Sequence, residues 1–268
     1  MDLDSINIKI NSMSSHQFFF LGILSTVFVL NSSCKNENKT IKTEIQTTTN
    51  TNIKAPEEMV WVEGKTFLQG AKEGDKYAMR REKPAHEVKV DGFFIDITEV
   101  TNAEFKKFVD ETGYITVAER PISWEEMKKE LPPNTPKPHD SVLQPGSLIF
   151  NKNVNKVANV GNYSQWWTWK IGANWKHPEG PESNIEGKDN YPVVHIALKD
   201  AKAYCKWANR RLPTEAEWEA AAQGKNSNAF YTWGNNTEIL NESANTWQGV
   251  FPIKNESKDG FSFVSPVK

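Results

Sequence analysis

This sequence has no dense block of Lys and Arg and no zinc-finger spacing, and its formal net charge is only -2. Nucleic acid is therefore disfavoured as a partner, because its phosphates are bound through concentrated positive charge. The sequence also has no apolar run of about 20 residues, the length that a membrane-spanning helix needs. Its 38% of hydrophobic residues nevertheless suffice for one sizeable core. We expect one folded domain behind an unfolded leader.

The main apolar run, Phe18 to Leu30, is typical of the hydrophobic region of an export signal. The segment 31–34 (NSSC) follows at once and resembles a bacterial lipobox, in which the cysteine becomes the lipidated first residue. We therefore predict a lipoprotein signal peptide over residues 1–34 with Cys34 lipidated. A simple signal peptide with an incidental cysteine is the alternative. The region before the run holds Lys9 as its single Lys or Arg, and Met13 is a second candidate start.

Residues 35–57 consist largely of Thr, Asn, Lys and Glu. Such a segment cannot bury enough apolar surface to offset the entropy lost on ordering, so it predicts a disordered tether. Together with the lipid, the tether predicts an exported protein of the bacterial cell envelope, anchored to the membrane on its periplasmic or outer-membrane face. Cysteines pair in that oxidising space, yet Cys205 is the only cysteine after Cys34.

The region 58–268 is rich in tryptophan beside Gly, Pro and Asn, which favours a loop-rich α+β domain. Met59–Gly70 alternates apolar and polar residues, as a half-buried strand does, and 88–90 and 92–96 predict two more strands. The segment 120–162 has no sustained periodicity and predicts a long loop.

Two capping boxes, in which a Thr is followed three residues later by a Glu, predict helix starts. Thr101 opens the first helix, which Gly113 ends. Thr214 opens the second, which ends at Gly224. A further helix is expected over 200–209, where Tyr204 and Cys205 share one face.

Three strings then carry a resemblance to a known family: Gly172–Pro181 (GANWKHPEGP), Arg211–Glu219 (RLPTEAEWE) and Ala244–Gly249 (ANTWQG). From Glu58 to Lys268 the chain resembles the formylglycine-generating enzymes, also called sulfatase-modifying factors. The second string marks the whole superfamily, including non-catalytic members, whereas the first is typical of the sulfatase-activating branch. The resemblance implies a C-type-lectin-like α+β fold with short helices, short strands and long loops.

The resemblance also implies an activity. The family binds an unfolded sulfatase and oxidises the cysteine of a C-x-P-x-R segment to Cα-formylglycine, using oxygen and a copper(I) ion held by two thiolates, which are the soft ligands that this ion prefers. In the family those two cysteines lie beyond the point that matches Lys268. We therefore expect a C-terminally truncated member that has no catalytic residue of its own. Cys205 matches a family cysteine of a structural disulfide, whose partner lies in the segment absent here.

Two further sites follow from the resemblance. Trp166 matches a tryptophan that lines the groove for the substrate peptide, although an aromatic cluster is as often core. A structural calcium site is implied by side-chain oxygens of Asn245 and Asp259 and by backbone carbonyls of Thr246 and Phe261, all of them the hard ligands that calcium prefers. An ordinary polar turn is the alternative to this site.

Other functions remain open at this point. His177 and His195 have no carboxylate or cysteine at ligand spacing, so we interpret both as structural. The rival hypotheses are a non-catalytic envelope lipoprotein of the gliding or secretion type and an oxygen-dependent enzyme that uses iron and histidines. The string Gly172–Pro181 argues against both.

Overall fold

The structure is a computed structural model that describes residues 54–226 and 229–267. The signal peptide, Cys34 and nearly all of the tether lie outside these ranges and stay predictions. Among the described residues, no helix is both long and apolar enough to pass through a bilayer. The strands there form four antiparallel pairs: β1 (Met59–Val62) with β4 (Phe93–Asp96), β2 (Lys65–Gln69) with β3 (His86–Val90), β5 (Gly146–Phe150) with β6 (Trp167–Ile171), and β7 (Gly249–Val250) with β8 (Lys254–Asn255).

The helices are short, and two of the three longer ones begin where the sequence predicts. They are α1 (Asn102–Thr112), α2 (Trp124–Met127), α3 (Leu198–Trp207), α4 (Glu215–Gln223) and α5 (Leu240–Ser243). Before α1, the Thr101 hydroxyl accepts the N–H of Glu104, and the Glu104 carboxylate accepts the N–H of Thr101. Gly113 ends α1 in the left-handed region, at φ 64°. Both predicted capping boxes are confirmed, the second by Thr214 and Glu217.

The prediction of one strand over Met59–Gly70 is wrong in one respect. Two strands form there, and β1 pairs with β4 whereas β2 pairs with β3. The break lies at Gly64, where a Cβ atom would come within 2.8 Å of the backbone nitrogen of Gly92. The two segments approach each other too closely for any residue with a side chain, so the glycine redirects the chain between the sheets.

The prediction of an irregular loop over 120–162 is also wrong in part, because the short helix α2 and the strand β5 form there. The partner of β5, β6, begins directly after Trp166, and all five of its residues are exposed. The β5 sequence GSLIF does not alternate apolar and polar residues, so periodicity did not reveal this strand. The β6 sequence WTWKI does alternate, and its aromatic and β-branched content is typical of strands, but this signal was not used in the prediction.

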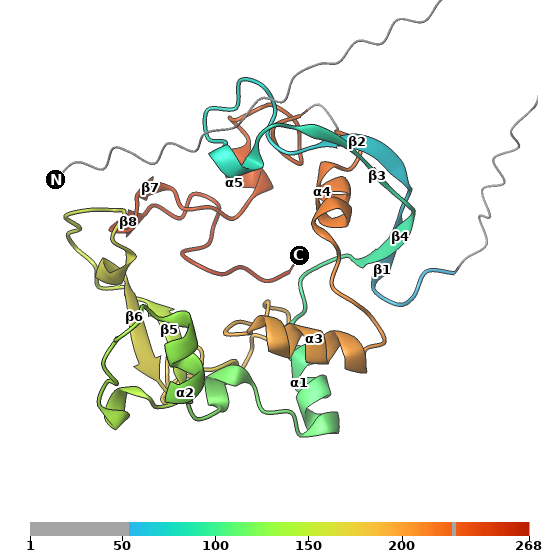
Figure 1. Cartoon of the computed structure of the whole chain (residues 1–268). Coiled ribbons are helices and arrows are strands. Elements are labelled where there is room, and N and C mark those ends of the chain that lie inside the picture. Colours follow the sequence, from blue (N-terminus) through green and yellow to red (C-terminus); the bar gives the residue numbers. More distant parts are fainter. Residues whose placement is uncertain (1–53, 227–228, 268) are drawn as a thin grey trace, which may run out of the picture. The chain divides into compact units, whose positions relative to one another are not determined.

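One core lies between α1 and α3, which run side by side (Figure 1). Phe105, Phe108, Trp175 and Tyr204 are buried in it, and the Phe105 ring lies 5.3 Å from both the Phe108 and the Trp175 ring. Edge-to-face contacts of this kind add to the free energy gained from burial. Trp175 belongs to the string Gly172–Pro181, so this string is anchored in the core.

A fully buried carboxylate holds the surroundings of α3 together. Asp200 accepts hydrogen bonds from the Tyr114 hydroxyl (3.0 Å) and from the N–H groups of Val117 (3.0 Å) and Ala197 (2.9 Å). A buried charge is tolerated when its lone pairs are used in this way. Asp200 thus joins the start of α3 to the segment that follows α1.

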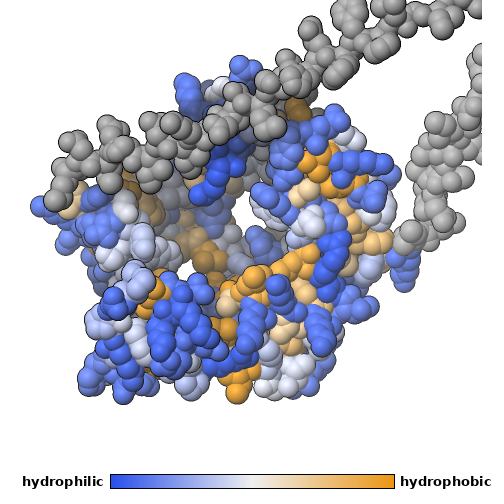
Figure 2. Space-filling model, viewed as in Figure 1, coloured by the Kyte–Doolittle hydropathy of each residue, from blue (hydrophilic) through white to orange (hydrophobic). Residues whose placement is uncertain are grey.

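A second core lies where α4 packs against β2 and β3 (Figure 1). It is formed by Phe67, Val90 and Ala220. Figure 2 shows that apolar residues also lie at the surface of the molecule, and the exposed ones include Leu212 and Trp218. Short helices, short antiparallel strands and long connections make this an α+β fold, as predicted.

Candidate functional site

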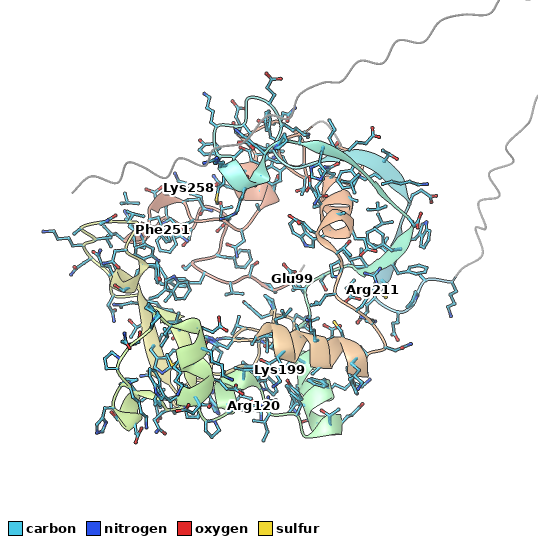
Figure 3. All side chains as sticks on the ribbon, in the orientation of Figure 1. Glu99, Arg120, Lys199, Arg211, Phe251 and Lys258 are labelled. Atoms are coloured by element: carbon cyan, nitrogen blue, oxygen red, sulfur yellow. The ribbon has the colours of Figure 1, made fainter. Side chains whose placement is uncertain are left out.

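Aromatic rings from distant parts of the chain gather beside the β5–β6 hairpin. We call this group the aromatic patch: Phe150, Trp167, Trp247, Phe251 and Phe263. Phe150 lies at its centre, with ring centroids 5.6 Å from Trp247, 5.7 Å from Phe263 and 6.0 Å from Trp167. Phe251, which is labelled in Figure 3, packs edge-on against Trp247. Only parts of these rings are covered, so the patch presents an apolar surface.

Trp166, the predicted substrate residue, lies beside this patch but is itself only 7% exposed. Its ring packs edge-on against Phe251 at 5.5 Å, and its carbonyl accepts the N–H of Asn151. The two tryptophans that follow are more accessible, since Trp167 is 39% and Trp169 is 42% exposed. The role of Trp166 in substrate binding stays a prediction, and Trp167 and Trp169 offer the wider surface.

The outer edge of β6 offers main-chain groups for pairing. The bonds from Asn151 to Trp166 and from Gly172 to Pro145 fix which residues face β5. By the alternation of an antiparallel ladder, the N–H and C=O groups of Trp167, Trp169 and Ile171 point away from β5. In the described part of the chain these groups have no hydrogen-bond partner. The three side chains also share one face, because they are two residues apart.

His195 ties this hairpin to the string Gly172–Pro181. Its Nδ1 lies 2.8 Å from the Ser147 hydroxyl oxygen of β5, and its Nε2 lies 2.8 Å from the Pro178 carbonyl. A carbonyl only accepts, so Nε2 carries a proton and donates it there. The backbone of His195 has φ 60°, a left-handed conformation that costs energy in a residue with a Cβ atom. Both its ring nitrogens are used, which agrees with a structural role.

His177 is held in the same string. Its Nδ1 lies 2.5 Å from the Ser183 carbonyl, and its N–H donates to Asn174. Next to it, Glu179 forms an ion pair with Lys152, whose ammonium also lies 4.9 Å from the centre of the Phe263 ring. The string therefore contacts the aromatic patch through this lysine.

The predicted calcium ligands lie on two segments, residues 245–246 and 259–261, which a hydrogen bond between Thr246 and Asp259 joins in the turn near β7 and β8. Asp259 accepts the N–H of Thr246 at Oδ2 and the N–H of Phe261 at Oδ1, each at 2.9 Å. Asn245 donates its amide N–H to the Phe263 carbonyl at 2.7 Å. Hydrogen bonds from the Gln248 side chain and from the backbone lower the pKa of the Asp259 carboxyl, so this group is ionised. Its charge and the neighbouring carbonyls fit calcium in ligand type.

Gln248 is a central residue of this turn that sequence reasoning missed. Its amide nitrogen lies 2.5 Å from the Thr246 carbonyl and 2.7 Å from Asp259 Oδ2. The residue stands in the quoted string Ala244–Gly249, two positions after a predicted ligand. This position was the signal that the sequence offered for Gln248. A side-chain amide both donates and accepts hydrogen bonds, so it indicates no particular role.

Cys205 lies on α3 at the wall of a cleft of about 1120 Å³. The cleft is also lined by Phe94, Asp96, Arg210 and Trp218. Burial, with a smaller contribution from the Asp96 carboxylate, raises the pKa of the Cys205 thiol, while the Arg210 guanidinium opposes this. Cys205 is the free thiol of the described residues, and they contain no cluster of three His, Cys, Asp or Glu side chains that could hold a metal ion.

Comparison with known proteins identifies the fold. The family profile described as "Sulfatase-modifying factor enzyme 1-like domain" matches residues 44–268. The chain belongs to this family. The shared fold of the sulfatase-modifying factors agrees with the α+β architecture and with the resemblance carried by the three strings.

The relatives of this chain include proteins named for the activity and proteins named as inactive. The mouse "Formylglycine-generating enzyme" is 42% identical over 187 residues, which cover 69% of this chain and 45% of the relative. The bovine "Inactive C-alpha-formylglycine-generating enzyme 2" is 37% identical over 209 residues, which cover 78% and 62%. The chain thus spans about half the length of the curated relatives it matches.

Among solved structures, PvdO from Pseudomonas aeruginosa aligns with a TM-score of 0.35 at 19% sequence identity. The alignment covers 62% of this chain and 46% of that chain.

Proposed function

We propose that this chain is the peptide-binding part of a formylglycine-generating enzyme. In this proposal an extended segment of an unfolded sulfatase, containing C-x-P-x-R, pairs with the outer edge of β6. The complete protein oxidises the cysteine of that segment to Cα-formylglycine. Family membership and the 42% identity to the mouse enzyme support the activity.

The observation that carries the peptide-binding part is the outer edge of β6, which pairs with no strand among the described residues. Trp167, Trp169 and Ile171 offer main-chain donors and acceptors along this edge, beside an apolar face. Strand addition uses just this combination, in which main-chain bonds give affinity and alternate side chains give specificity. Flat indole rings also suit the proline and the arginine of the peptide, the latter through cation–π contacts.

The described residues do not fit a copper(I) site of two thiolates. They hold one thiol, Cys205, and burial favours its protonated form. Purified chain supplied with copper(I), oxygen and a C-x-P-x-R peptide is therefore expected to give no aldehyde mass shift. An aldehyde product that is lost in Cys205→Ser would show that this thiol takes part in the oxidation. It would contradict the conclusion that the described residues do not fit a copper(I) site.

Binding is tested separately from turnover. Fluorescence anisotropy with a labelled C-x-P-x-R peptide should show saturable binding, and methylation of single peptide amides should weaken it at every second position, because only alternate amides face β6. Trp169→Ala should weaken binding about tenfold through the lost aromatic contact. Thr168→Ala, on the opposite face of the same strand, is the matched control. Equal affinity of both variants, or no periodicity in the scan, would reject pairing with β6.

A non-catalytic envelope protein is the second candidate. The similar identity to a relative named inactive supports it, as does the single thiol of the described residues. This candidate predicts no selective binding of the C-x-P-x-R peptide over a scrambled peptide.

We also propose that calcium stabilises the fold through Asn245, Thr246, Asp259 and Phe261. Calcium would add two positive charges where a carboxylate and carbonyls converge, and it would raise stability by binding the native state alone. Thermal melts with calcium and with chelator test this. Identical melts in both, for the parent chain and for Asp259→Ala, would reject the site.

For the N-terminus we propose lipidation of Cys34 and anchoring to a membrane of the cell envelope. The apolar run and the segment 31–34 support this. Mass spectrometry of the mature N-terminus, with and without globomycin, tests it. Cleavage elsewhere with Cys34 unmodified would reject lipidation.

A further inference from the structure

We infer that the loop between β2 and β3 is a second contact surface, which lays the folded region against anionic lipid headgroups. The loop spans residues 70–85 and connects the two strands at one end of their sheet (Figure 1). This inference goes beyond peptide binding. It uses the membrane anchoring proposed above, and the experiment below separates the two.

Hydrogen bonds within the loop fix its shape. At its base, the Ala71 N–H donates to the Glu82 carbonyl at 2.9 Å. The Glu82 carboxylate accepts the N–H of Met79 at 3.0 Å, and the Met79 carbonyl accepts the N–H of Glu82 at 3.0 Å. Nearer its start, Asp75 Oδ1 accepts the N–H of Tyr77 at 2.9 Å. The loop therefore presents its side chains in a set arrangement, so that binding a partner requires little further ordering of the main chain.

Two side chains with large apolar parts project from this loop. Tyr77 is 88% exposed and Met79 is 51% exposed. A tyrosine has an apolar ring and a polar hydroxyl, which suits the boundary between lipid headgroups and acyl chains. A methionine side chain is flexible and adapts to an irregular surface. Both residues can therefore enter a lipid surface without a preformed groove.

Cations flank these two side chains. They are all exposed and form no ion pair within the part of the chain that the structure describes: Lys76, Arg80, Arg81 and Lys83. The one carboxylate between residues 76 and 83 is that of Glu82, and it binds the N–H of Met79. The loop thus carries a local positive charge, although the net charge of the whole chain is -2.

This combination distinguishes the loop from the aromatic patch. At the patch, the ammonium of Lys152 is paired with the carboxylate of Glu179, so the surface is mainly apolar. At the loop, cations without a partner surround two apolar side chains, as in segments that bind anionic membranes. Lipid phosphates would meet the cations while Tyr77 and Met79 enter between the headgroups. A bilayer that contains anionic lipid is therefore the partner whose chemistry fits the loop.

The predicted tether makes a weak surface affinity sufficient. About 20 residues separate Cys34 from the described residues, and a flexible chain of that length spans about 25 Å on average. The anchor would hold the loop near the bilayer at an effective concentration of about 1 mM or more. Each cation close to an anionic surface strengthens binding by a factor of about five. Four cations would then keep the loop on the bilayer for most of the time.

Hydrogen exchange measured by mass spectrometry tests this on the full chain, reconstituted into vesicles. Vesicles of phosphatidylcholine alone are compared with vesicles of phosphatidylcholine and phosphatidylglycerol. The amides of residues 76–83 should exchange about tenfold more slowly on the anionic vesicles. High salt should remove this difference, because it screens the charges.

A pair of double variants tests the charges. Arg80→Ser with Arg81→Ser should weaken docking about thirtyfold, since two cations are lost. The matched control is Lys199→Ser with Lys202→Ser, which removes the same charge from exposed positions of α3, where Figure 3 labels Lys199. An equal loss in both double variants would show an effect of overall charge and would overturn the inference.

A pair of tyrosine variants tests the apolar contact. Tyr77→Ser should weaken docking about fivefold, because the inserted ring is lost. Tyr163→Ser is the control, since Tyr163 is 66% exposed and lies outside the loop. Both side chains are exposed, so neither change should affect the melting temperature. Exchange in Tyr77→Ser that equals exchange in the parent would reject insertion of this loop.

Flotation of the same vesicles separates the inference from the anchoring. Slow exchange of the loop on anionic vesicles alone supports the inference, and if the chain floats only with those vesicles, the anchor is rejected. Flotation with both vesicle types and equal exchange on both overturns the inference and leaves the anchoring standing, since the loop is then open to solvent or to a protein partner. A chain that floats with neither vesicle type overturns both.

Discussion

Two aromatic regions of this molecule have similar residues and opposite surroundings. Between α1 and α3, the rings of Phe105, Phe108 and Trp175 are almost fully buried and contact each other on several sides. Beside β5 and β6, the rings of the aromatic patch also contact each other, but Trp167 and its neighbour Trp169 remain well exposed. Aromatic content alone therefore does not distinguish a core from a binding surface.

The difference lies in what covers the rings. The core rings are enclosed by two helices whose ends are fixed by Thr101, Gly113 and Asp200. The patch rings lie beside the pair of β5 and β6 and are only partly covered, with Trp167 39% exposed and Phe251 and Phe263 each 42% exposed. A buried ring contributes mainly to the stability of the fold. A half-covered ring still has apolar surface that a partner can bury, so it can contribute to the free energy of binding.

The largest effect is expected from Phe105→Ala. Phe105 lies at the centre of the α1–α3 core, so its loss removes buried surface and leaves a cavity, which should lower the free energy of unfolding by about 3–5 kcal/mol. Urea denaturation followed by circular dichroism measures this. A loss below about 1 kcal/mol would show that the core is no better packed than the patch.

Alkaline pH should weaken the core selectively. Burial, with the negative charge of Glu104, raises the pKa of Tyr204 to about 12. The folded state therefore disfavours ionisation of Tyr204. The stability that the neutral phenol contributes is fully present below the unfolded pKa near 10 and is lost as pH rises through 12. The loss should reach about 2–3 kcal/mol. Stability measured from pH 8 to 12 should fall less in Tyr204→Phe; equal curves would contradict the assignment.

A smaller effect is expected from Asp200→Asn, which changes one buried oxygen to an NH₂ group. The amide can still accept from Tyr114 and Val117 but opposes the N–H of Ala197 with a second donor. The N–H of Ala197 then faces a second donor and has no acceptor, which should lower the free energy of unfolding by about 2 kcal/mol. Thermal melts compare it with Ser147→Ala, which removes one bond to His195 and should cost less. A neutral Asp200→Asn would mean that water replaces the lost bond.

The smallest effect on stability is expected from Trp169→Ala. The ring is 42% exposed, so its truncation should change the free energy of unfolding by no more than about 0.5 kcal/mol. Peptide affinity should nevertheless fall, as proposed above. Melting temperature and peptide titration, measured on the same preparation, show whether Trp169 contributes to binding or to the stability of the fold. A large loss of stability would place Trp169 in the core and end the contrast.

The sequence predicts the parts of this fold that local chemistry determines. The capping boxes at Thr101 and Thr214 and the stop at Gly113 place two helices, because each uses bonds within a few residues. The α3 helix was predicted two residues too late, because Asp200 is the third residue of its first turn and caps it through the N–H of Ala197. That bond is local, but the motif lacks the usual Ser or Thr at the N-cap.

The parts that escaped prediction depend on distant segments. The turn at Gly64 follows from its close approach to Gly92, and no property of Met59–Gly70 alone reveals it. In the pair of β5 and β6, the sequence GSLIF of β5 lacks alternation, whereas the alternation of WTWKI in β6 was a signal that the prediction did not use. At the candidate calcium site, the resemblance supplied four ligands, but the geometry of Gln248 could be seen only once β7 and β8 brought the turn together.

The attachment of β1 has a mechanical consequence. Arg210 binds both the carbonyl of Glu57 and the carboxylate of Asp96, and Ile97 donates its N–H to the Glu58 carbonyl. A pull on the chain before Glu57 reaches these bonds first and then the antiparallel pairs of β1 and β4, starting at Met59 and Asp96. The pairs would be loaded one after another, as in a zip, and not all together in shear. Arg210 is therefore the first fastening that tension from the N-terminal side has to break.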